Sequence, residues 1–237
     1  TEDFVLYSLS YLKNKYNLND FDFIFLELGV GSGNIILNFF DYFKNNSKNI
    51  FIGSDISFKA INLASENFKI NFNYLHNNLF YLINSDKFSF INFNKLMNFL
   101  ISNNLNLIIF SNPPYLNKKE IKKLYDPFIS LYSKNKISFY LYIIDFILKL
   151  IDSYYLNKNL LSNVKVKNIV KVKNIENISI ETFLEIDKLG FKKLFNKKNN
   201  KLLKKIEILK KNRISKNIYY FYIKYRDFFV NISFYIV

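Results

Sequence analysis

The sequence predicts a single α/β domain, residues 1–237, built on a doubly wound and mostly parallel sheet. In the first half of the chain, short apolar runs alternate with longer helical patterns, as strands and helices do around a parallel sheet. The first apolar run ends in a cluster of glycines, which lets a strand turn sharply into a helix while a ligand approaches the backbone. We therefore expect a Rossmann-like fold, with an antiparallel edge contributed by the C-terminal strands.

The elements of the first half follow from the spacing of apolar residues. Residues 3–15 carry them at helical spacing, whereas 21–28 is a continuous apolar run typical of a buried strand. Ser57 is of a residue type that caps helices, so it marks a helix start. In order, the expected elements are helix 3–15, strand 21–28, helix 34–43, strand 49–55, helix 57–70, strand 72–76 and strand 105–110, with 81–104 ambiguous between a helix and an irregular insertion.

The second half is less regular. We expect a helix over 137–155, a strand over 181–186, and a terminal strand over 218–225 that pairs with 205–209 as the antiparallel edge. The hexapeptide of 164–169 is repeated without change at 170–175, which indicates an exposed low-complexity insertion around 157–177. The most apolar stretch, 137–151, is too short and too charged to span a membrane, so no membrane partner is expected.

Composition excludes several kinds of site. The chain has no cysteine, which rules out disulfides, thiolate zinc sites and a cysteine nucleophile. Its one histidine, His76, makes a histidine-based metal site or a Ser–His–Asp triad very improbable, and we interpret it as structural. No metal site and no signal peptide are expected, and the cytoplasm is the expected compartment.

The formal net charge of +15 would ordinarily indicate a nucleic acid or another anionic partner. However, only Arg213 and Arg226 are arginines, and Lys, Asn, Ile, Phe and Tyr dominate. These residues have AT-rich codons, so an AT-rich genome is the simplest source of the lysines. We therefore discount the charge as an indication of a partner, and expect contact with nucleic acid only indirectly, through a ribosomal factor.

The first segment that carries chemistry is Glu27-Leu28-Gly29-Val30-Gly31-Ser32-Gly33, between a strand and a helix. Three of the five glycines of the chain lie here. The spacing differs from the nicotinamide-dinucleotide fingerprint, whose third glycine would fall at Asn34. It resembles motif I of S-adenosylmethionine-dependent methyltransferases. Asp55 ends the next strand, where a carboxylate can accept both ribose hydroxyls. A dinucleotide site and a ligand-free turn remain alternatives.

The second segment is Ser111-Asn112-Pro113-Pro114-Tyr115, which contains two of the three prolines of the chain. It resembles the N-P-P-Y motif of methyltransferases that act on planar exocyclic or amide nitrogens. Such a nitrogen is a poor nucleophile because its lone pair is delocalised. The Asn112 side-chain oxygen and the Pro113 carbonyl can each accept one N–H of the target, while Tyr115 stacks on its planar face. Catalysis is then mainly positioning and needs no titratable base.

Over residues 1–186 the chain resembles the peptide chain release factor N(5)-glutamine methyltransferases, the HemK-like family. Besides the two motifs, the resemblance rests on two further stretches. Residues 123–131 come after the N-P-P-Y segment and contain the acid–proline pair Asp126-Pro127, as the family's sequences do there. Leu184-Glu185-Ile186 matches the family's L-E-I-G strand, except that Asp187 replaces the glycine. Two shorter matches are Thr1-Glu2 and Asn77-Asn78-Leu79-Phe80, in which Asn78 replaces the usual acid. The given sequence starts at Thr1 and does not include the family's helical N-terminal domain, so we expect a fragment or a trimmed chain.

The resemblance implies an enzyme that transfers a methyl group from S-adenosylmethionine to the glutamine of the Gly-Gly-Gln motif of release factors. It implies these cofactor-binding residues: Glu27, Gly29, Val30, Gly31, Ser32, Gly33, Asp55, Asn78, Leu79 and Asn112. The catalytic residues would be Asn112, Pro113 and Tyr115, and Pro114 would join them in binding substrate. Two alternatives stay open. One is a methyltransferase of guanine N2 in ribosomal RNA or adenine N6 in DNA, whose phosphates would use the positive charge. The other is a non-catalytic binding domain.

Overall fold

A computed structural model describes residues 2–16, 22–72, 80–113, 138–163, 180–186, 188–195, 203–205, 207–215, 217–226 and 228–236. Its helices are α1 (Glu2–Lys15), α2 (Asn34–Phe43), α3 (Phe58–Phe72), α4 (Phe93–Asn103), α7 (Ser138–Asn163) and α8 (Lys188–Leu194), with the short 3-10 helix η2 (Leu203–Lys205). Its strands are β1 (Asp22–Leu28), β2 (Ile50–Asp55), β3 (Phe80–Asn84), β4 (Leu105–Ser111), β5 (Ile180–Ile186), β6 (Glu207–Ser215), β7 (Ile218–Tyr225) and β8 (Phe228–Ile236).

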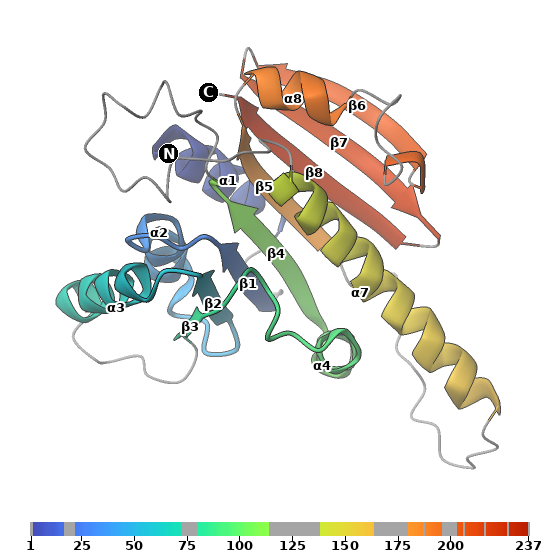
Figure 1. The fold of residues 1–237 in the computed structure, drawn as a ribbon, viewed down its shortest axis with the longest axis horizontal. Coiled ribbons are helices and arrows are strands. Elements are labelled where there is room, and N and C mark those ends of the chain that lie inside the picture. The colour runs from blue at the N-terminus through green and yellow to red at the C-terminus, as the bar shows by residue number, and fades with distance from the viewer. Residues whose placement is uncertain are drawn as a thin grey trace.

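The strands form one sheet in the order β3-β2-β1-β4-β5-β8-β7-β6 (Figure 1). From β3 to β8 every neighbouring pair is parallel. The two remaining pairs, β8–β7 and β7–β6 at the far edge of the sheet, are antiparallel. The chain is therefore an α/β protein with a mostly parallel sheet and an antiparallel C-terminal edge, which confirms the expected class and is compatible with a Rossmann-like fold.

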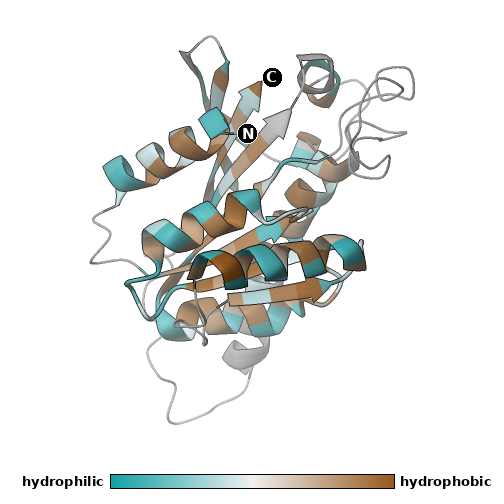
Figure 2. Cartoon of the chain, turned by 90° about the vertical axis from the view of Figure 1, so that its left-hand side faces the viewer, coloured by the Kyte–Doolittle hydropathy of each residue, from teal (hydrophilic) through white to brown (hydrophobic). Residues whose placement is uncertain are grey.

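Helices cover both faces of the sheet. Successive side chains of a strand point to opposite faces, so each buried strand contributes to two cores. In β1, Phe23 and Phe25 join a core with α1, α2 and α3, whereas Ile24 and Leu26 join the core formed by α4 and α7. Figure 2 shows strands that are mainly hydrophobic and helices that carry both hydrophobic and hydrophilic residues, as two-faced coverage requires. Among the helices of the described residues, none is both long and apolar enough to cross a membrane.

The first half agrees with expectation except for its third strand. The Ser57 hydroxyl accepts a hydrogen bond from the Ala60 N–H at 3.3 Å, as expected of a helix cap. The strand expected at 72–76 is wrong at Phe72, which is the last residue of α3, and 73–76 lie outside the described residues. The third strand is β3, whose Phe80 ring stacks on Phe68 at 4.2 Å. Phe72 stays helical because its ring packs one turn from Phe68, at 5.4 Å.

The ambiguous stretch 81–104 contains the rest of β3 and then α4. The Asn92 side chain caps α4 by accepting a hydrogen bond from the Lys95 N–H, and Asn104 ends the helix in a left-handed conformation. Helix α7 runs past the expected 137–155 to Asn163, so the insertion expected from 157 begins as helix instead. The remainder of that insertion, with the repeat at 164–175, lies outside the described residues.

The C-terminal edge contains one strand more than expected. Strand β7 matches the expected 218–225, but it is not the terminal strand. It pairs antiparallel with β6, which spans Glu207–Ser215 and not the expected 205–209, because Lys205 belongs to η2. Strand β8 follows it and lies between β5 and β7. The connecting turn is held by Arg226, which has a left-handed backbone (φ 55°) and pairs with Asp152 of α7 at 2.9 Å. This contact bridges residues distant in the sequence, which is why local patterns did not indicate it.

Candidate functional site

The glycine loop, residues 29–33, joins β1 to α2 and is hydrogen-bonded to the end of β2. The N–H groups of Gly29 and Val30 both donate to the Ser54 carbonyl, at 2.8 and 3.0 Å. All three glycines of the loop have a positive φ: 76° at Gly29, 54° at Gly31 and 85° at Gly33. Residues with a side chain rarely adopt this conformation, so the path of the loop depends on glycine.

The three glycines differ in what surrounds them. A methyl group added at Gly33 would lie 3.1 Å from Leu37 Cδ1 and 3.2 Å from Ala64 Cβ, so this glycine lets α2 and α3 pack closely. A methyl group added at Gly29 or Gly31 would meet no atom within 4 Å. The backbone at these two positions therefore faces open space, where a ligand could approach the loop without an intervening side chain.

Gly53 in β2 supports the loop from below, a role that the sequence analysis missed. A methyl group added there would lie 2.9 Å from Val30 Cγ2 and 3.0 Å from Leu82 Cδ2. Because Gly53 has no side chain, Val30 can pack against the strand, where it is almost completely buried. The signal in the sequence was a glycine inside an apolar strand, in a chain that has only five.

Asp55, at the end of β2, fastens the loop to the start of α3. One oxygen of its carboxylate accepts a hydrogen bond from the Gly31 N–H at 3.0 Å, and the other accepts from the Ser57 N–H at 2.8 Å. An ionised carboxylate offers about four acceptor positions, so both oxygens retain capacity for donors from a ligand. The side chain is partly exposed, which leaves it accessible from the edge of the sheet.

Glu27 lies beneath the loop rather than on its open side. Its side chain is 1% exposed, and Oε2 accepts a hydrogen bond from the Ile36 N–H at 2.9 Å. Gly33 occupies the N-cap position of α2 and has no side chain that could accept a hydrogen bond from the free N–H groups at the start of this helix. The Glu27 carboxylate accepts one of these hydrogen bonds instead. Burial raises the pKa of Glu27 well above its ordinary value, the Ile36 N–H opposes that shift, and the negative charge of Asp55 adds to it.

The N-P-P-Y segment begins at the end of β4, which is the parallel neighbour of β1. The Ser111 hydroxyl donates to the Leu28 carbonyl at 2.7 Å and ties the two strand ends together. Asn112, which is partly buried, and Pro113, which is buried, follow directly. Since the carboxyl ends of parallel strands meet at one edge, Asp55, the glycine loop and Asn112 follow three adjacent strands at the same edge.

Several expected positions lie outside the described residues, so their geometry stays a prediction. They are Thr1, His76, Asn77, Asn78, Leu79, Pro114, Tyr115, Asp187 and the stretch 123–131.

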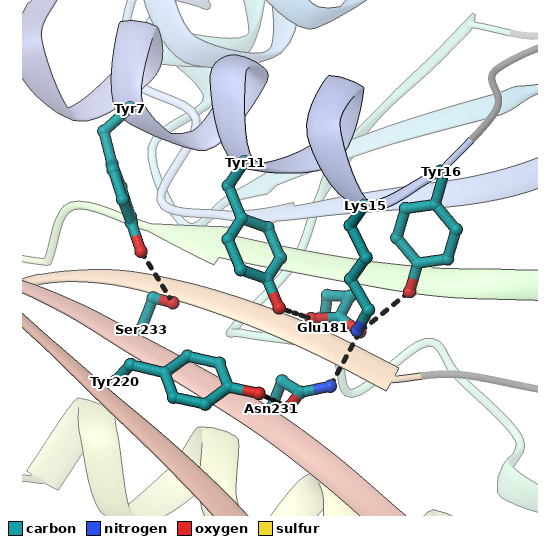
Figure 3. Close-up of polar contacts among 8 residues, drawn as sticks. All are labelled: Tyr7, Tyr11, Lys15, Tyr16, Glu181, Tyr220, Asn231 and Ser233. Atoms are coloured by element: carbon teal, nitrogen blue, oxygen red, sulfur yellow. Dashed lines mark hydrogen bonds and ion pairs between the residues drawn. The ribbon is translucent and has the colours of Figure 1, made fainter. Parts of the chain in front are cut away.

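A second polar cluster, which the sequence analysis did not find, surrounds Glu181 of β5 (Figure 3). This side chain is 1% exposed. It accepts hydrogen bonds from Tyr11 at 3.2 Å, from Tyr16 at 2.8 Å and from the Asn231 amide at 2.9 Å, and it forms an ion pair with Lys15. Burial, followed by the Glu181 charge, raises the pKa of Tyr11 above its ordinary value. The cluster fastens α1 to β5 and β8, and we interpret it as structural.

Comparison with known proteins adds no identification: no protein-family model matches the chain, and no curated protein sequence matches it.

Proposed function

We propose that this protein transfers a methyl group from S-adenosylmethionine to the side-chain amide nitrogen of the glutamine in the Gly-Gly-Gln motif of peptide chain release factors. One observation carries the proposal. The glycine loop, Asp55 and the start of the N-P-P-Y segment follow three adjacent parallel strands at one edge of the sheet. In open α/β sheets, ligands bind at this edge.

The residues present fit the cofactor. Gly29 and Gly31 present bare backbone to open space, and Asp55 holds the loop while retaining acceptor positions for ribose hydroxyls. Glu27 and Gly53 support the loop from beneath, so its shape is preorganised. When bound, S-adenosylmethionine would supply a methyl group on a positively charged sulfonium sulfur, and the neutral thioether S-adenosylhomocysteine would be the leaving group.

The protein's own contribution is to position the acceptor nitrogen. The side-chain oxygen of Asn112 and the carbonyl of Pro113 each accept one N–H of the glutamine amide, which fixes its plane and directs the nitrogen at the methyl group. Burial of Pro113 and the bond from Ser111 to Leu28 hold this segment against β1. Fixed geometry of this kind can lower a barrier by several kcal/mol, on the order of 7. The methylated amide nitrogen then loses one proton, which can pass to water, so no side chain at the site needs to act as a titrating base.

The choice of glutamine rests on the resemblance of the motifs and their flanking residues, and an assay of three acceptors tests it. Methyl transfer from labelled S-adenosylmethionine is measured on a release factor, on its Gln→Ala loop variant, and on a mixture of total RNA and DNA. We expect label in the release factor that disappears in the loop variant. Label only in the nucleic acid would retain methyl transfer but overturn the substrate.

A pair of asparagine variants assigns the activity to the proposed site. Asn112→Ala should lose at least about 100-fold in turnover, because one of two positioning acceptors is gone, while cofactor affinity stays within about a few-fold of the wild type. Asn94→Ala, an exposed position on α4, is the matched control and should keep full activity. Preserved turnover in Asn112→Ala would contradict the assigned role.

A further inference from the structure

The positive charge of the chain is concentrated in one segment. Residues 188–226 contain 14 lysines and arginines and a single carboxylate, Glu207, which gives them a net charge of +13. The other 198 residues contain 20 lysines and arginines and 18 aspartates and glutamates, so they are nearly neutral. Codon bias acts on the whole gene and would enrich lysine throughout. It does not account for a surplus confined to 39 residues.

This segment folds into the outer end of the sheet. It supplies α8, η2, β6 and β7. Figure 1 shows α8 lying over β6 and β7, and these two strands are at the opposite end of the sheet from β2 and β3. Of its two arginines, Arg226 is engaged with Asp152 and supports the turn. The exposed cations of the described residues here define what we call the basic patch: Lys192, Lys193, Lys205, Lys211 and Arg213.

Aromatic rings lie directly beneath part of the basic patch. The Lys211 ammonium lies 5.5 Å from the centre of the Phe221 ring and 5.8 Å from that of Tyr219. The Arg213 guanidinium lies 5.6 Å from the same Tyr219 ring. These rings support the cations at the surface, and the half-buried Tyr219 places an aromatic side chain among them.

We propose that the basic patch binds the phosphate backbone of single-stranded RNA. Five exposed cations on α8, η2 and β6, with one carboxylate in the whole segment, are complementary to a polyanion. A single strand fits better than a duplex, because the patch lies on strands and on a helix of seven residues, too short to read a major groove. Lys211 and Arg213 beside the half-buried Tyr219 on a sheet match the pairing of cations and aromatic rings typical of surfaces that bind unpaired bases. Long single strands in cells are mainly RNA.

This surface is separate from the candidate methyl-transfer site, so the two proposals can fail independently. The patch belongs to β6, α8 and η2, whereas the glycine loop, Asp55 and Asn112 follow β1, β2 and β4. RNA binding could bring the protein to ribosomes, where release factors act, without RNA being the methyl acceptor.

Two variants with the same net charge test the location of binding. Lys192→Gln/Lys193→Gln/Lys205→Gln removes three exposed charges from the patch. The control, Lys13→Gln/Lys69→Gln/Lys95→Gln, removes three exposed charges from α1, α3 and α4. Binding of a labelled RNA of about 20 nucleotides is followed by fluorescence anisotropy between about 50 and 300 mM KCl.

The wild type should bind RNA with an affinity that falls steeply with salt. The patch variant should bind about 10- to 100-fold more weakly near 100 mM KCl, with a salt slope shallower by about 2, because each lost phosphate contact removes about 0.7. The control variant should stay within about two-fold of the wild type. Equal weakening of both variants, or salt-independent binding by the wild type, would overturn the proposal.

Three competitors establish the partner. DNA of the same sequence, double-stranded RNA and vesicles containing phosphatidylserine should each bind more weakly than the single-stranded RNA. Tighter binding of any of them would overturn the assignment to single-stranded RNA. Methyl transfer to a release factor, measured on the patch variant, should be unchanged, so loss of RNA binding is separated from failure of the proposed enzymatic function.

Discussion

The contact between Gly53 and Val30 predicts that Gly53→Ala weakens cofactor binding from beneath the loop. The added methyl group would lie 2.9 Å from Val30 Cγ2, whereas carbon atoms in favourable contact lie about 3.5 to 4.0 Å apart. Val30 must therefore move by roughly 0.6 Å or more, and it carries the backbone between Gly29 and Gly31 with it. Overpacking of this kind costs about 1–3 kcal/mol. If about 1.4 kcal/mol of that cost falls on the bound state, affinity drops about ten-fold.

Calorimetric titration with S-adenosylmethionine, combined with thermal denaturation, measures this effect. Val30→Ala removes Cγ2, the atom at 2.9 Å, while Leu82 Cδ2 at 3.0 Å remains, so Gly53→Ala/Val30→Ala should recover part of the affinity lost in Gly53→Ala. Gly29→Ala is the matched control, because its cost comes from the positive φ and not from Val30, and Val30→Ala should not rescue it. Unchanged affinity and melting temperature in Gly53→Ala, or strictly additive effects in the double variant, would refute the reasoning.

Two further predictions concern stability. Glu27 has a folded-state pKa raised above its unfolded value, so the folded protein binds the proton more tightly and loses stability as pH rises from about 4.5 towards the folded pKa. The free energy of unfolding, measured by urea denaturation at several pH values, should not show this loss in Glu27→Gln. If it changed with pH in the same way in both proteins, the raised pKa of Glu27 would not be the cause. Tyr16→Phe removes a 2.8 Å hydrogen bond to buried Glu181 and should cost about 1.5–3 kcal/mol, whereas Tyr42→Phe, at an exposed position, should cost almost nothing. Equal stabilities would show that the Glu181 cluster does not anchor α1.

The sequence predicted those parts of the fold in which local patterns determine the structure. Strand β1, the turn at the glycines and α2 follow each other directly, so apolar spacing and glycine placement were sufficient to predict them. The strand expected at 72–76 was wrong at Phe72, because the spacing around Phe72 is compatible with a strand or a helix until Phe68 is seen packed against it. Strand β8 escaped prediction because its place between β5 and β7 depends on distant pairing.

The same distinction holds for the candidate site. The sequence indicated Asp55 as a ligand residue, but its bond to the Gly31 N–H appears only when β2 and the loop are folded together. The Glu181 cluster joins residues near both ends of the chain, such as Tyr11 and Asn231, so no spacing in the sequence predicts it.

Calorimetric titration of wild type and Asp55→Ala with S-adenosylmethionine tests the central claim most directly, with Asp41→Ala, an exposed carboxylate on α2, as the matched control. The account predicts micromolar binding by the wild type and an unchanged affinity in Asp41→Ala. It predicts about 10- to 100-fold weaker binding in Asp55→Ala, since charge-assisted hydrogen bonds to the ribose and the anchor of the loop are both lost. No binding by the wild type, or equal affinities in all three proteins, would contradict it.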